Sequence, residues 1–576
     1  MENSSLPEKI CLTHIVPGNH AASDYFAALR ELLKHRQQEN EHTEKSRWQQ
    51  AIDDIYRLLD DEIRTNRAAP IKPVSFGTSG WRGLLGKDVH VHSVRQVTQA
   101  IINIYQQAAG EPKLARALGV QNIDEARRRG VVLGHDNRFG GPVLAEAAAA
   151  LLSGKGFTVH FAGETTTGVI SAAVLVTGAA FSINLTPSHN PLEYGGFKYN
   201  AADAGPAAAI ITNRITKEAE KIIRAGEEPV ADPAPNLIHP LDSLACWQQL
   251  VRDNHHRHGL DYDAILAALK QRDDYVLAID CAHGASRVHL DTLLAGLPAR
   301  RLLRFRDQAD PTFNGIAPEP SSENMAMVRQ ALQDRPEPLK LGAIIDPDGD
   351  RIRFTDGTRE FDMNMFGAMS YHYLHEHKGK QGPVAKTVAS SNFANSIAAG
   401  LGEEVFEPPV GFKEFKPVIG KALVLFEESD GISVIGHTPE KDAYIGLLLA
   451  LDMMLQRPGG LYDYLQDIRS RFGEFFPGRG GVTVSKQGEA LQEALAGLEH
   501  YRVGDSLPVG DTPRTIKELI TIDGRKMIFE DESWLMIRPS GTEPKVRFYV
   551  EARTEADKTQ LLAAAHALLK EIGLLE

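Results

Sequence analysis

The sequence predicts an α/β protein that is divided into several domains and begins with a helical extension. Its 576 residues are too many for one hydrophobic core, and four domains of ordinary size would account for them. Short apolar runs typical of buried strands alternate with alanine-rich stretches typical of helices, which favours sheets with largely parallel strands. Passages rich in proline and glycine interrupt this alternation and indicate where domains end.

Residues 1–70 form the predicted extension, with two helices at roughly 23–40 and 44–65. In the second helix, apolar residues recur every three or four positions, so they lie on one face that must be buried. These residues are Trp48, Ile52, Ile55, Leu59 and Ile63. We expect a helical hairpin packed against the first domain, with association between subunits as the alternative.

The rest of the chain is predicted to divide into domains at 71–235, 236–355, 356–475 and 482–576. The first three resemble one another in size and order of elements, and the last is a smaller α/β domain. The proline-rich passage 229–240 separates the first two, and 476–481 is predicted to be a linker. Predicted strands lie at 131–134, 180–185, 275–279, 341–345 and 422–426, and predicted helices at 144–152 and 443–455.

Composition excludes several classes of protein. The formal net charge of −13 argues against binding to nucleic acid or to a membrane surface, both of which usually require a basic face. The three cysteines have neither paired nor metal-type spacing, so no disulfide framework or zinc site is predicted. No leader pattern and no apolar stretch of about 20 residues is present, so we expect a cytoplasmic protein.

A polar loop at 186–191 follows the predicted strand 180–185. Pro187 and Pro191 restrict the backbone on both sides of the loop, which places Ser188 and His189 on a stiff turn. A stiff turn of this kind holds the Ser188 hydroxyl in one position. An ordinary Ser/Asn turn is the plain alternative for this stretch taken alone.

Three aspartates, Asp346, Asp348 and Asp350, follow the predicted strand 341–345 at alternate positions. In a tight loop all three side chains can turn toward one point, where their repulsion calls for a cation. Hard oxygen ligands select Mg²⁺ or Ca²⁺. An EF-hand loop is excluded because its sixth and twelfth positions, normally Gly and Glu, are Arg351 and Gly357 here.

A third motif, residues 538–547, lies between two apolar runs near the C-terminus. Its arginines, hydroxyls and backbone amides offer charged and neutral donors that suit a phosphate group. A basic surface loop is the alternative interpretation. The motif therefore indicates phosphate binding without covalent chemistry.

Together these motifs resemble those of the α-D-phosphohexomutases, in the same order along the chain. Residues 186–191 resemble the phosphoserine loop of the family, and further matches at 76–83 and 195–198 extend the resemblance from about Phe76 to Arg553. The resemblance implies the four-domain phosphohexomutase architecture. It also implies that Ser188 carries the phosphate, and that Asp346, Asp348, Asp350 and a phosphoserine oxygen at Ser188 bind Mg²⁺.

The same resemblance implies roles for other residues. Arg82 and Lys198 would face the reacting phosphate, and His189 joins them as a catalytic candidate. The implied substrate-binding residues are Arg351, Gly411, Phe412, Lys413, Glu427, Ser429 and Lys441. The implied clamp for the non-reacting phosphate consists of Arg538, Ser540, Gly541, Thr542 and Arg547. Residues 135–138 and 280–284 also match, with largely structural roles.

The loop at 410–413 resembles that of phosphoglucomutases more than the Gly-Asp-Arg type of phosphomannomutases and phosphoglucosamine mutases. One departure from the family lies two residues after Ser429, where many members have histidine and this chain has Gly431. The general acid and base therefore stay open among Lys198, the first choice, His437 and Lys441.

The resemblance implies a phosphoglucomutase that interconverts glucose 1-phosphate and glucose 6-phosphate, with glucose 1,6-bisphosphate as intermediate and activator. A phosphomannomutase, a dual-specificity enzyme and a glucose-1,6-bisphosphate synthase are the alternatives within this chemistry. A non-catalytic sugar-phosphate binder would have little use for both Ser188 and the aspartates. The expected partner is a small sugar phosphate, and both a monomer and a homodimer stay open.

Two other enzyme classes lack their motifs. A nucleotide-dependent kinase would need a Gly-rich phosphate loop ending in Lys-Ser/Thr, but Gly86-Lys87 is followed by Asp88. A serine hydrolase would need Gly-x-Ser-x-Gly, whereas Ser188 stands between Pro187 and His189.

Overall fold

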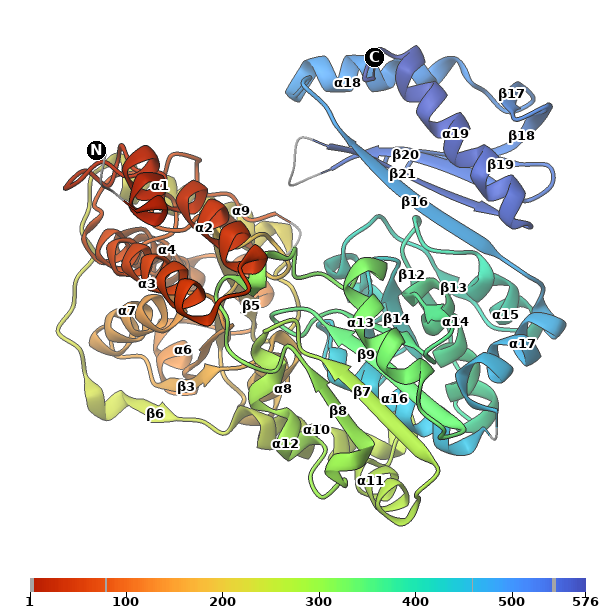
Figure 1. The fold of residues 1–576 in the computed structure, drawn as a ribbon, viewed down its shortest axis with the longest axis horizontal. Helices are drawn as coiled ribbons and strands as arrows, with labels where there is room; N and C mark the ends of the chain where they lie inside the picture. Colours follow the sequence, from red (N-terminus) through yellow and green to blue (C-terminus); the bar gives the residue numbers. More distant parts are fainter. Residues whose placement is uncertain (1–4, 78–79, 458, 541–544, 576) are drawn as a thin grey trace. The chain divides into compact units, whose positions relative to one another are not determined.

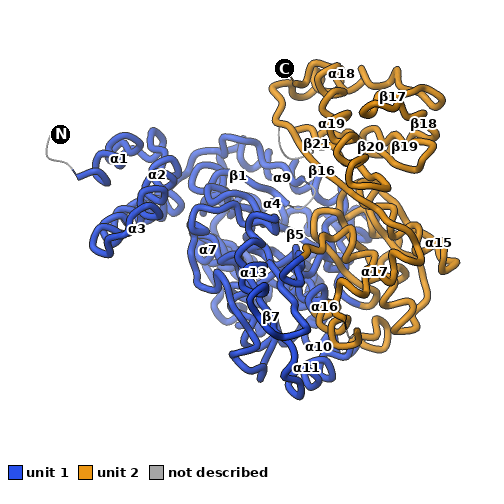
Figure 2. Tube along the Cα trace, turned by 45° about the vertical axis from the view of Figure 1, so that its right-hand side comes forward, with its two compact units in different colours: residues 1–253, 261–358, 437–447 blue, residues 254–260, 359–436, 448–576 orange. Residues whose placement is uncertain are grey.

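The computed structural model describes residues 5–77, 80–457, 459–540 and 545–575 (Figure 1). Contacts divide the chain into two compact units (Figure 2). Unit 1 comprises residues 1–253, 261–358 and 437–447, and unit 2 comprises residues 254–260, 359–436 and 448–576. Among the described residues, no helix is both long and apolar enough to cross a membrane.

The N-terminal extension of unit 1 consists of α1 (Leu6–His14), α2 (Tyr25–Gln38) and α3 (His42–Thr65). All five apolar residues of the predicted stripe on α3 are buried, in one core that is continuous with the first sheet and its helices. The prediction of a helical hairpin packed on the first domain is confirmed. Helix α1 was not predicted, although Ser5 and Glu8 form a capping box at its start.

The first sheet has the strand order β1-β5-β4-β2-β3-β6. Its strands are β1 (Trp81–Leu84), β2 (Val131–His135), β3 (Val159–Glu164), β4 (Phe181–Leu185), β5 (Tyr194–Ala201) and β6 (Ile238–Pro240). β2 is parallel to β3 and β4, and β5 is antiparallel to both β4 and β1.

Helices cover both faces of the first sheet. Val131 and Leu133 of β2 lie in the core that includes α7 (Gly141–Gly154), while Val132 lies in a second core with α8 (Thr167–Thr177). This alternation follows from the two-residue period of a strand. The other helices of this part are α4 (Val91–Gln107), α5 (Pro112–Leu118), α6 (Ile123–Arg129) and α9 (Ala209–Arg224).

The second sheet of unit 1 places β10 (Ile352–Thr355), β9 (Leu339–Ile345), β7 (Tyr275–Asp280) and β8 (Leu302–Phe305) side by side. β7 is parallel to β8 and β9, and β10 is antiparallel to β9. The helices nearby in the chain are α10 (Ser243–His258), α11 (Tyr262–Gln271), α12 (Leu290–Leu293) and α13 (Ser322–Gln333).

The third sheet belongs to unit 2 and has the order β13-β12-β14-β15. Its strands are β12 (Val384–Lys386), β13 (Val405–Phe406), β14 (Val424–Glu427) and β15 (Gly431–Val434). β12 is parallel to β13 and β14, and β15 is antiparallel to β14. The short strand β11 (Glu360–Phe361) and the helices α14 (Met363–His372), α15 (Phe393–Leu401), α16 (Ala443–Gln456) and α17 (Gly460–Phe472) belong to the same stretch of chain.

In each of the three sheets, the strand at one edge of a group of parallel strands forms an antiparallel hairpin with the next strand in the chain. The hairpins are β4–β5, β9–β10 and β14–β15. Their turns contain Ser188, the three aspartates, and Ser429, respectively. Three of the predicted functional motifs therefore occupy the same position in three repeated α/β domains.

The C-terminal domain is a six-stranded sheet with the order β16-β21-β20-β19-β18-β17. Its elements are β16 (Phe476–Thr483), α18 (Gly488–Ala496), β17 (Ser506–Val509), β18 (Thr512–Ile520), β19 (Arg525–Phe529), β20 (Trp534–Pro539), β21 (Lys545–Ala552) and α19 (Glu555–Glu571). The predicted α/β fold, with three similar domains and a smaller last one, is confirmed.

The prediction that 476–481 is a linker is wrong, because these residues begin the edge strand β16. β16 pairs with β21 along its whole length, from Phe476 opposite Ala552 to Thr483 opposite Lys545. Its glycines signal close packing here: a Cβ atom at Gly480 would lie 2.3 Å from the Phe548 ring. Glycine in a strand and glycine in a linker look alike in sequence.

Candidate active site

The loop that carries Ser188 is held by a chain of buried hydrogen bonds. Ser188 has φ of 59°, a left-handed conformation that is uncommon for a residue with a side chain. Its N–H donates to Thr186 Oγ1 at 2.8 Å, and Thr186 Oγ1 donates to Asp136 Oδ2 at 2.6 Å. β5 runs so close to the loop that a Cβ atom at Gly196 would lie 2.3 Å from the Thr186 carbonyl oxygen. The Ser188 hydroxyl is thus fixed in position.

Arg138 holds the carbonyl groups of the same loop. Its guanidinium donates to the Ser188 and Pro191 carbonyl oxygens, each at 2.6 Å, and also to the Asn190 carbonyl oxygen. Arg138 is only 5% exposed, so this contact is shielded from water. The sequence indicated a structural role for 135–138, but only the structure identifies Arg138 as the residue that orders the loop.

The Ser188 hydroxyl contacts the loop that carries the three aspartates. Ser188 Oγ donates to Asp346 Oδ2 at 2.9 Å, and Asp346 Oδ1 accepts from the Asp350 and Arg351 backbone N–H groups at 3.0 Å each. Gly349, with φ of 63°, lets the loop turn beside α8, where a Cβ atom would lie 2.6 Å from Thr166. The loop thereby brings all three carboxylates to the serine.

This group of carboxylates has the composition of a site for a hard cation. All three aspartates are at most 1% exposed, and one oxygen from each lies within 4.8 Å of the others. The Oδ1 atoms of Asp348 and Asp350 are buried without a hydrogen-bond partner among the described residues. A group of buried carboxylates, two of which have an oxygen that accepts no hydrogen bond among the described residues, suits Mg²⁺, which prefers oxygen ligands.

Lys198 places a positive charge beside two of these aspartates. Its Nζ lies 2.6 Å from Asp348 Oδ2 and 2.8 Å from Asp350 Oδ2. Burial favours the neutral amine, but the two carboxylates outweigh burial and raise the pKa of Lys198. Lys198 is therefore a cation at neutral pH.

The electrostatic environment differs between neighbouring aspartates. Burial and the negative charges of Asp348 and Asp350 raise the pKa of Asp346 well above its usual range. At Asp350 burial acts in the same direction, but Lys198, Lys441 and Arg351 outweigh it and hold the pKa well below the usual value. The cations of the site are thus concentrated around Asp350.

The other two catalytic candidates lie close to the serine loop. His189 Nδ1 is 3.4 Å from Ser188 Oγ. Burial and the positive charges of Arg351 and Arg82 hold the pKa of His189 well below its usual value, so the imidazole is neutral. Arg82 lies on β1, opposite Gly196 of β5.

Residues 437–447 come from the third sequence domain but belong to unit 1. Lys441 Nζ lies 3.4 Å from Asp350 Oδ2, and the Ala443 N–H donates to the Gly349 carbonyl oxygen at 3.0 Å. His437 is buried with its Nε2 2.5 Å from Asp442 Oδ2. Of the three candidates for acid or base, Lys198 and Lys441 thus contact the group of three aspartates, whereas His437 pairs with Asp442.

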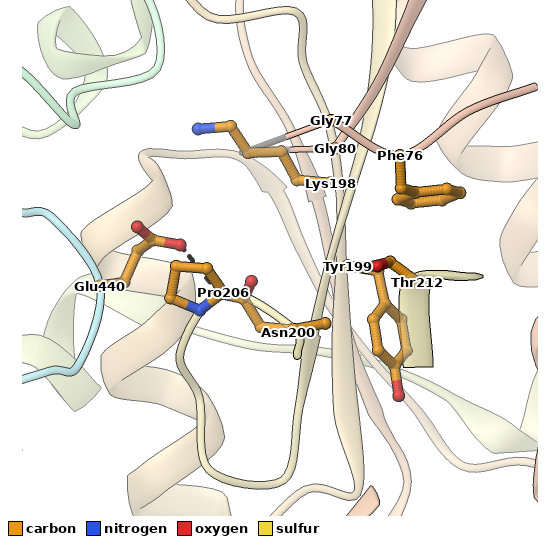
Figure 3. A pocket seen from close by; sticks show the side chains of 10 residues that line it. Phe76, Gly77, Gly80, Lys198, Tyr199, Asn200, Pro206, Thr212 and Glu440 are labelled. Atoms are coloured by element: carbon orange, nitrogen blue, oxygen red, sulfur yellow. Dashed lines mark hydrogen bonds between the residues drawn. The ribbon is translucent and has the colours of Figure 1, made fainter. Parts of the chain in front are cut away.

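A pocket lies beside Lys198 (Figure 3). It is lined by Phe76, Gly77, Gly80, Lys198, Tyr199, Asn200, Pro206, Ala207, Thr212 and Glu440. Asn200 Nδ2 donates to Glu440 Oε2 at 3.3 Å, and Glu440 is 3% exposed. Glu440 adds a further carboxylate to the surroundings of Lys198.

The predicted sugar-binding residues lie in unit 2, where a hydrogen bond joins their two loops. The Gly411 N–H donates to Glu427 Oε1 at 3.0 Å, and Ser429 is half-buried in the β14–β15 turn. The Phe412 side chain is 4% exposed and packs against Phe415, so its ring anchors the loop, while Lys413 is partly exposed. The loops at 410–413 and 427–429 therefore form one structural group.

Two residues that sequence reasoning missed support this group. Arg479 of β16 donates to the Glu428 carbonyl oxygen at 2.9 Å and lies 3.7 Å from Asp430 Oδ2. Asp523 accepts from the Val410 N–H at 2.9 Å. Arg479 was missed because residues 476–481 were predicted to be a linker. The Asp-Gly pair at 523–524 is a turn signal that could have indicated Asp523.

The predicted phosphate-binding motif links β20 and β21. Arg538 and Arg547 face each other in the ladder, and Arg538 Nε lies 3.0 Å from Asp523 Oδ2. The Ser540 N–H donates to the Lys545 carbonyl oxygen at 2.8 Å. Gly541 and Thr542 lie outside the described residues. Asp523 therefore connects this motif to Val410, at the start of the 410–413 loop.

Comparison with known proteins identifies the family. Models of the phosphoglucomutase/phosphomannomutase alpha/beta/alpha domains I, II and III match residues 73–225, 258–359 and 362–472. The model of the C-terminal domain matches residues 482–568. The chain belongs to the phosphohexomutase family. As in other phosphohexomutases the four domains follow in sequence order, and the chain is an enzyme of the mutase class.

Relatives of this phosphohexomutase have different named substrates. A probable phosphoglucosamine mutase of Methanosphaera stadtmanae is 25% identical over 87% of this chain and 99% of its own. A phosphoglucomutase of Komagataeibacter xylinus is 26% identical over 90% of this chain and 94% of its own. A putative phosphomannomutase from Thermus thermophilus is 25% identical in sequence, and its structure matches with a TM-score of 0.69 over 87% of this chain and 99% of its own.

More distant structures share the fold of the phosphohexomutase. Two are of Aspergillus fumigatus N-acetylphosphoglucosamine mutase, 13% identical with TM-scores of 0.51 and 0.50, each covering 90% of this chain and at least 98% of its own. One is a complex with GlcNAc-6P and magnesium, and the other a complex with glucose 1,6-bisphosphate.

Proposed function

We propose that this phosphohexomutase transfers phosphate between the 1- and 6-hydroxyls of glucose through a phosphoserine at Ser188. The observation that carries the proposal is the 2.9 Å hydrogen bond from Ser188 Oγ to Asp346, within a buried group of three aspartates. A rigid hydroxyl beside a cation-binding carboxylate group is the arrangement that phosphoryl transfer needs.

The proposed reaction begins with phosphorylated Ser188. The free hydroxyl of glucose 1-phosphate or glucose 6-phosphate attacks the phosphorus and passes its proton to a general base, while the bond from phosphorus to Ser188 Oγ breaks and a general acid protonates that oxygen. This gives glucose 1,6-bisphosphate and a free serine side chain. The bisphosphate then presents its other phosphate, which returns to Ser188 by the reverse steps. The enzyme begins and ends phosphorylated, and the net reaction is an isomerisation.

Within this scheme, Asp346, Asp348 and Asp350 would hold Mg²⁺ together with an oxygen of phosphoserine 188. Magnesium bound there would neutralise charge on the transferred phosphoryl group. The buried Oδ1 atoms of Asp348 and Asp350, which have no hydrogen-bond partner among the described residues, support this assignment, as does the magnesium complex of the Aspergillus fumigatus relative.

The positively charged side chains would stabilise the phosphoryl oxygens directly. Arg82 and Lys198 would face the reacting phosphate, and the general acid and base would come from Lys198, Lys441 or His437. The raised pKa of Lys198 keeps its side chain protonated at neutral pH, so it would act there as a fixed positive charge more readily than as a base. In unit 2, Arg538, Ser540, Gly541, Thr542 and Arg547 would bind the phosphate that does not react.

Glucose is the proposed sugar because of the phosphoglucomutase-like loop at 410–413. Glucose and mannose differ only at carbon 2, so the loops that meet the ring, and not the phosphate clamp, must discriminate between them. Arg351, Lys441, Gly411, Lys413, Glu427 and Ser429 would contact the substrate, with Phe412 anchoring its loop. The hydrogen bond between Gly411 and Glu427 supports a single recognition group.

Catalytic efficiency on three sugars tests this assignment. A lost hydrogen bond to a charged group costs about 1.5–3 kcal/mol, so we expect glucose 1-phosphate to be preferred over mannose 1-phosphate by roughly one to two orders of magnitude in kcat/KM. Coupled assays with glucose, mannose and glucosamine 1-phosphates measure this directly. Equal efficiency on glucose and mannose would indicate a dual-specificity enzyme, and preference for another sugar would reassign the substrate.

Two variants of Glu427 separate charge from loop position in the same assays. Glu427→Gln retains an oxygen that can accept the Gly411 N–H, whereas Glu427→Ala does not. We expect both to lower turnover, with the larger loss in Glu427→Ala, while phosphate on Ser188 stays intact by mass spectrometry. Unchanged turnover in Glu427→Ala would remove Glu427 from the binding site.

A further inference from the structure

The N-terminal extension contacts the second domain at a short loop. This loop, Asp310–Gly315, precedes α13. From α2, Arg36 donates to Asn314 Oδ1 at 3.2 Å, and the Gln37 amide donates to the Asn314 carbonyl oxygen. Phe313 and Asn314 have φ of 51° and 50°, a left-handed conformation that is disfavoured for residues with side chains. Contacts from α2 therefore help to hold a strained loop in place.

The strained loop places an aromatic ring against Arg138. The Arg138 guanidinium lies 4.7 Å from the centre of the Phe313 ring, and Phe313 is fully buried. A guanidinium over an aromatic face is attracted to it, and burial strengthens the attraction. Arg138 is also the residue that binds the carbonyl oxygens of Ser188, Asn190 and Pro191. Phe313 thus fixes the orientation of the group that orders the serine loop.

A second contact runs from α3 to the residue after Arg138. The centres of the Tyr56 and Phe139 rings lie 4.5 Å apart, and Tyr56 is 8% exposed. Its hydroxyl has no hydrogen-bond partner among the described residues, so the ring alone makes this contact. At the far end of the serine loop, Arg30 of α2 lies 3.2 Å from Glu193, although this pair is partly exposed and contributes little.

We propose that the N-terminal extension is a positioning element for the phosphoserine loop and acts on Ser188 through Phe313, Phe139 and Arg138. The family models begin at residue 73, so this element lies outside the part of the chain that they match. The proposal rests on the proposed function of Ser188. A hairpin that only adds buried area would stabilise the fold without changing the order of the serine loop.

Hydrogen exchange and kinetics distinguish the two roles. In the variants Gln37→Ala and Phe313→Leu, we expect the backbone amides of Ser188 to Asn190 to exchange hydrogen about tenfold faster than in the wild type. We also expect kcat to fall about tenfold or more, because a small displacement of a reacting group slows the reaction strongly. The KM for glucose 1-phosphate should change less than about twofold, because the sugar and phosphate loops are untouched.

Matched variants control for general effects. Gln50→Ala removes a glutamine of α3 whose side chain, within the described part of the structure, hydrogen-bonds to Asp54 of the same helix, and should leave both exchange and kcat unchanged. Tyr56→Phe keeps the ring and should behave like the wild type, whereas Tyr56→Leu should resemble Phe313→Leu. Gln37 is exposed, so Gln37→Ala gives folded protein even where loss of a buried ring does not.

A double-mutant cycle tests whether the effect passes through Arg138. If it does, Phe313→Leu should lower kcat far less in an Arg138→Met background than in the wild type. Equal losses in both backgrounds, or normal loop exchange in Gln37→Ala and Phe313→Leu, would overturn the proposal. A wild-type enzyme without mutase activity would instead overturn the proposed function, and the exchange measurement would still decide the positioning role.

Discussion

Ser188→Ala should lose its phosphate and lower mutase turnover by about 10⁴-fold or more, because the scheme has no other group to carry the phosphoryl between the two hydroxyls. Ser188 is the one hydroxyl that donates to Asp346 among the described hydrogen bonds, and its loop is fixed by Thr186 and Arg138. Intact-mass measurement should find about one phosphate on the wild type after incubation with glucose 1,6-bisphosphate, and none on the variant.

Ser153→Ala is the matched control for this variant. Ser153 is also buried in unit 1, and its hydroxyl donates to the Ala150 carbonyl oxygen and accepts from the Ala234 N–H. Its loss should leave phosphorylation and turnover near the wild-type level. Near-normal turnover in Ser188→Ala, or phosphate retained on that variant, would contradict the proposed mechanism.

The second large effect concerns the metal. Chelation should abolish turnover, and added Mg²⁺ should restore it. Asp348→Ala should lower turnover by about 10³-fold, because the loss of one metal ligand removes several kcal/mol of transition-state stabilisation. Mg²⁺ at about 100 times its Kd should also raise the free energy of unfolding of the wild type by about 2.7 kcal/mol. This stabilisation is measurable by denaturation without any substrate and should disappear in Asp348→Ala.

Asp356→Asn provides the control for the metal variants. Asp356 lies just after β10, and its carboxylate accepts from the Thr358 N–H at 2.7 Å, outside the group of three aspartates. This variant should keep the response to Mg²⁺. Full turnover of Asp348→Ala in the presence of chelator, or Mg²⁺ stabilisation that survives in Asp348→Ala, would rule out the proposed site.

Local patterns in the sequence determined the fold class and the position of the motifs. The strands before Ser188 and before Asp346 are mostly apolar, and every residue of them except Lys340 is buried, so the turns that follow them are recognisable from composition. The stripe on α3 was predictable because helical periodicity is a property of neighbouring residues. For the same reason, the segment 476–481 was misread, since nothing local distinguishes a glycine-rich edge strand from a linker.

What the tertiary structure decided is which distant residues meet. The sequence identified Ser188, the three aspartates and Lys198 as separate motifs. Hydrogen bonds to the β9–β10 turn, from Ser188 in the β4–β5 turn and from Lys198 on β5, join them in one charged group. The roles of Arg138, Phe313 and the N-terminal hairpin appear only when residues far apart in the sequence come into contact, such as Arg138 and Phe313. Such contacts depend on how elements pack, and packing between elements leaves no periodic signal in the chain that would reveal the partner.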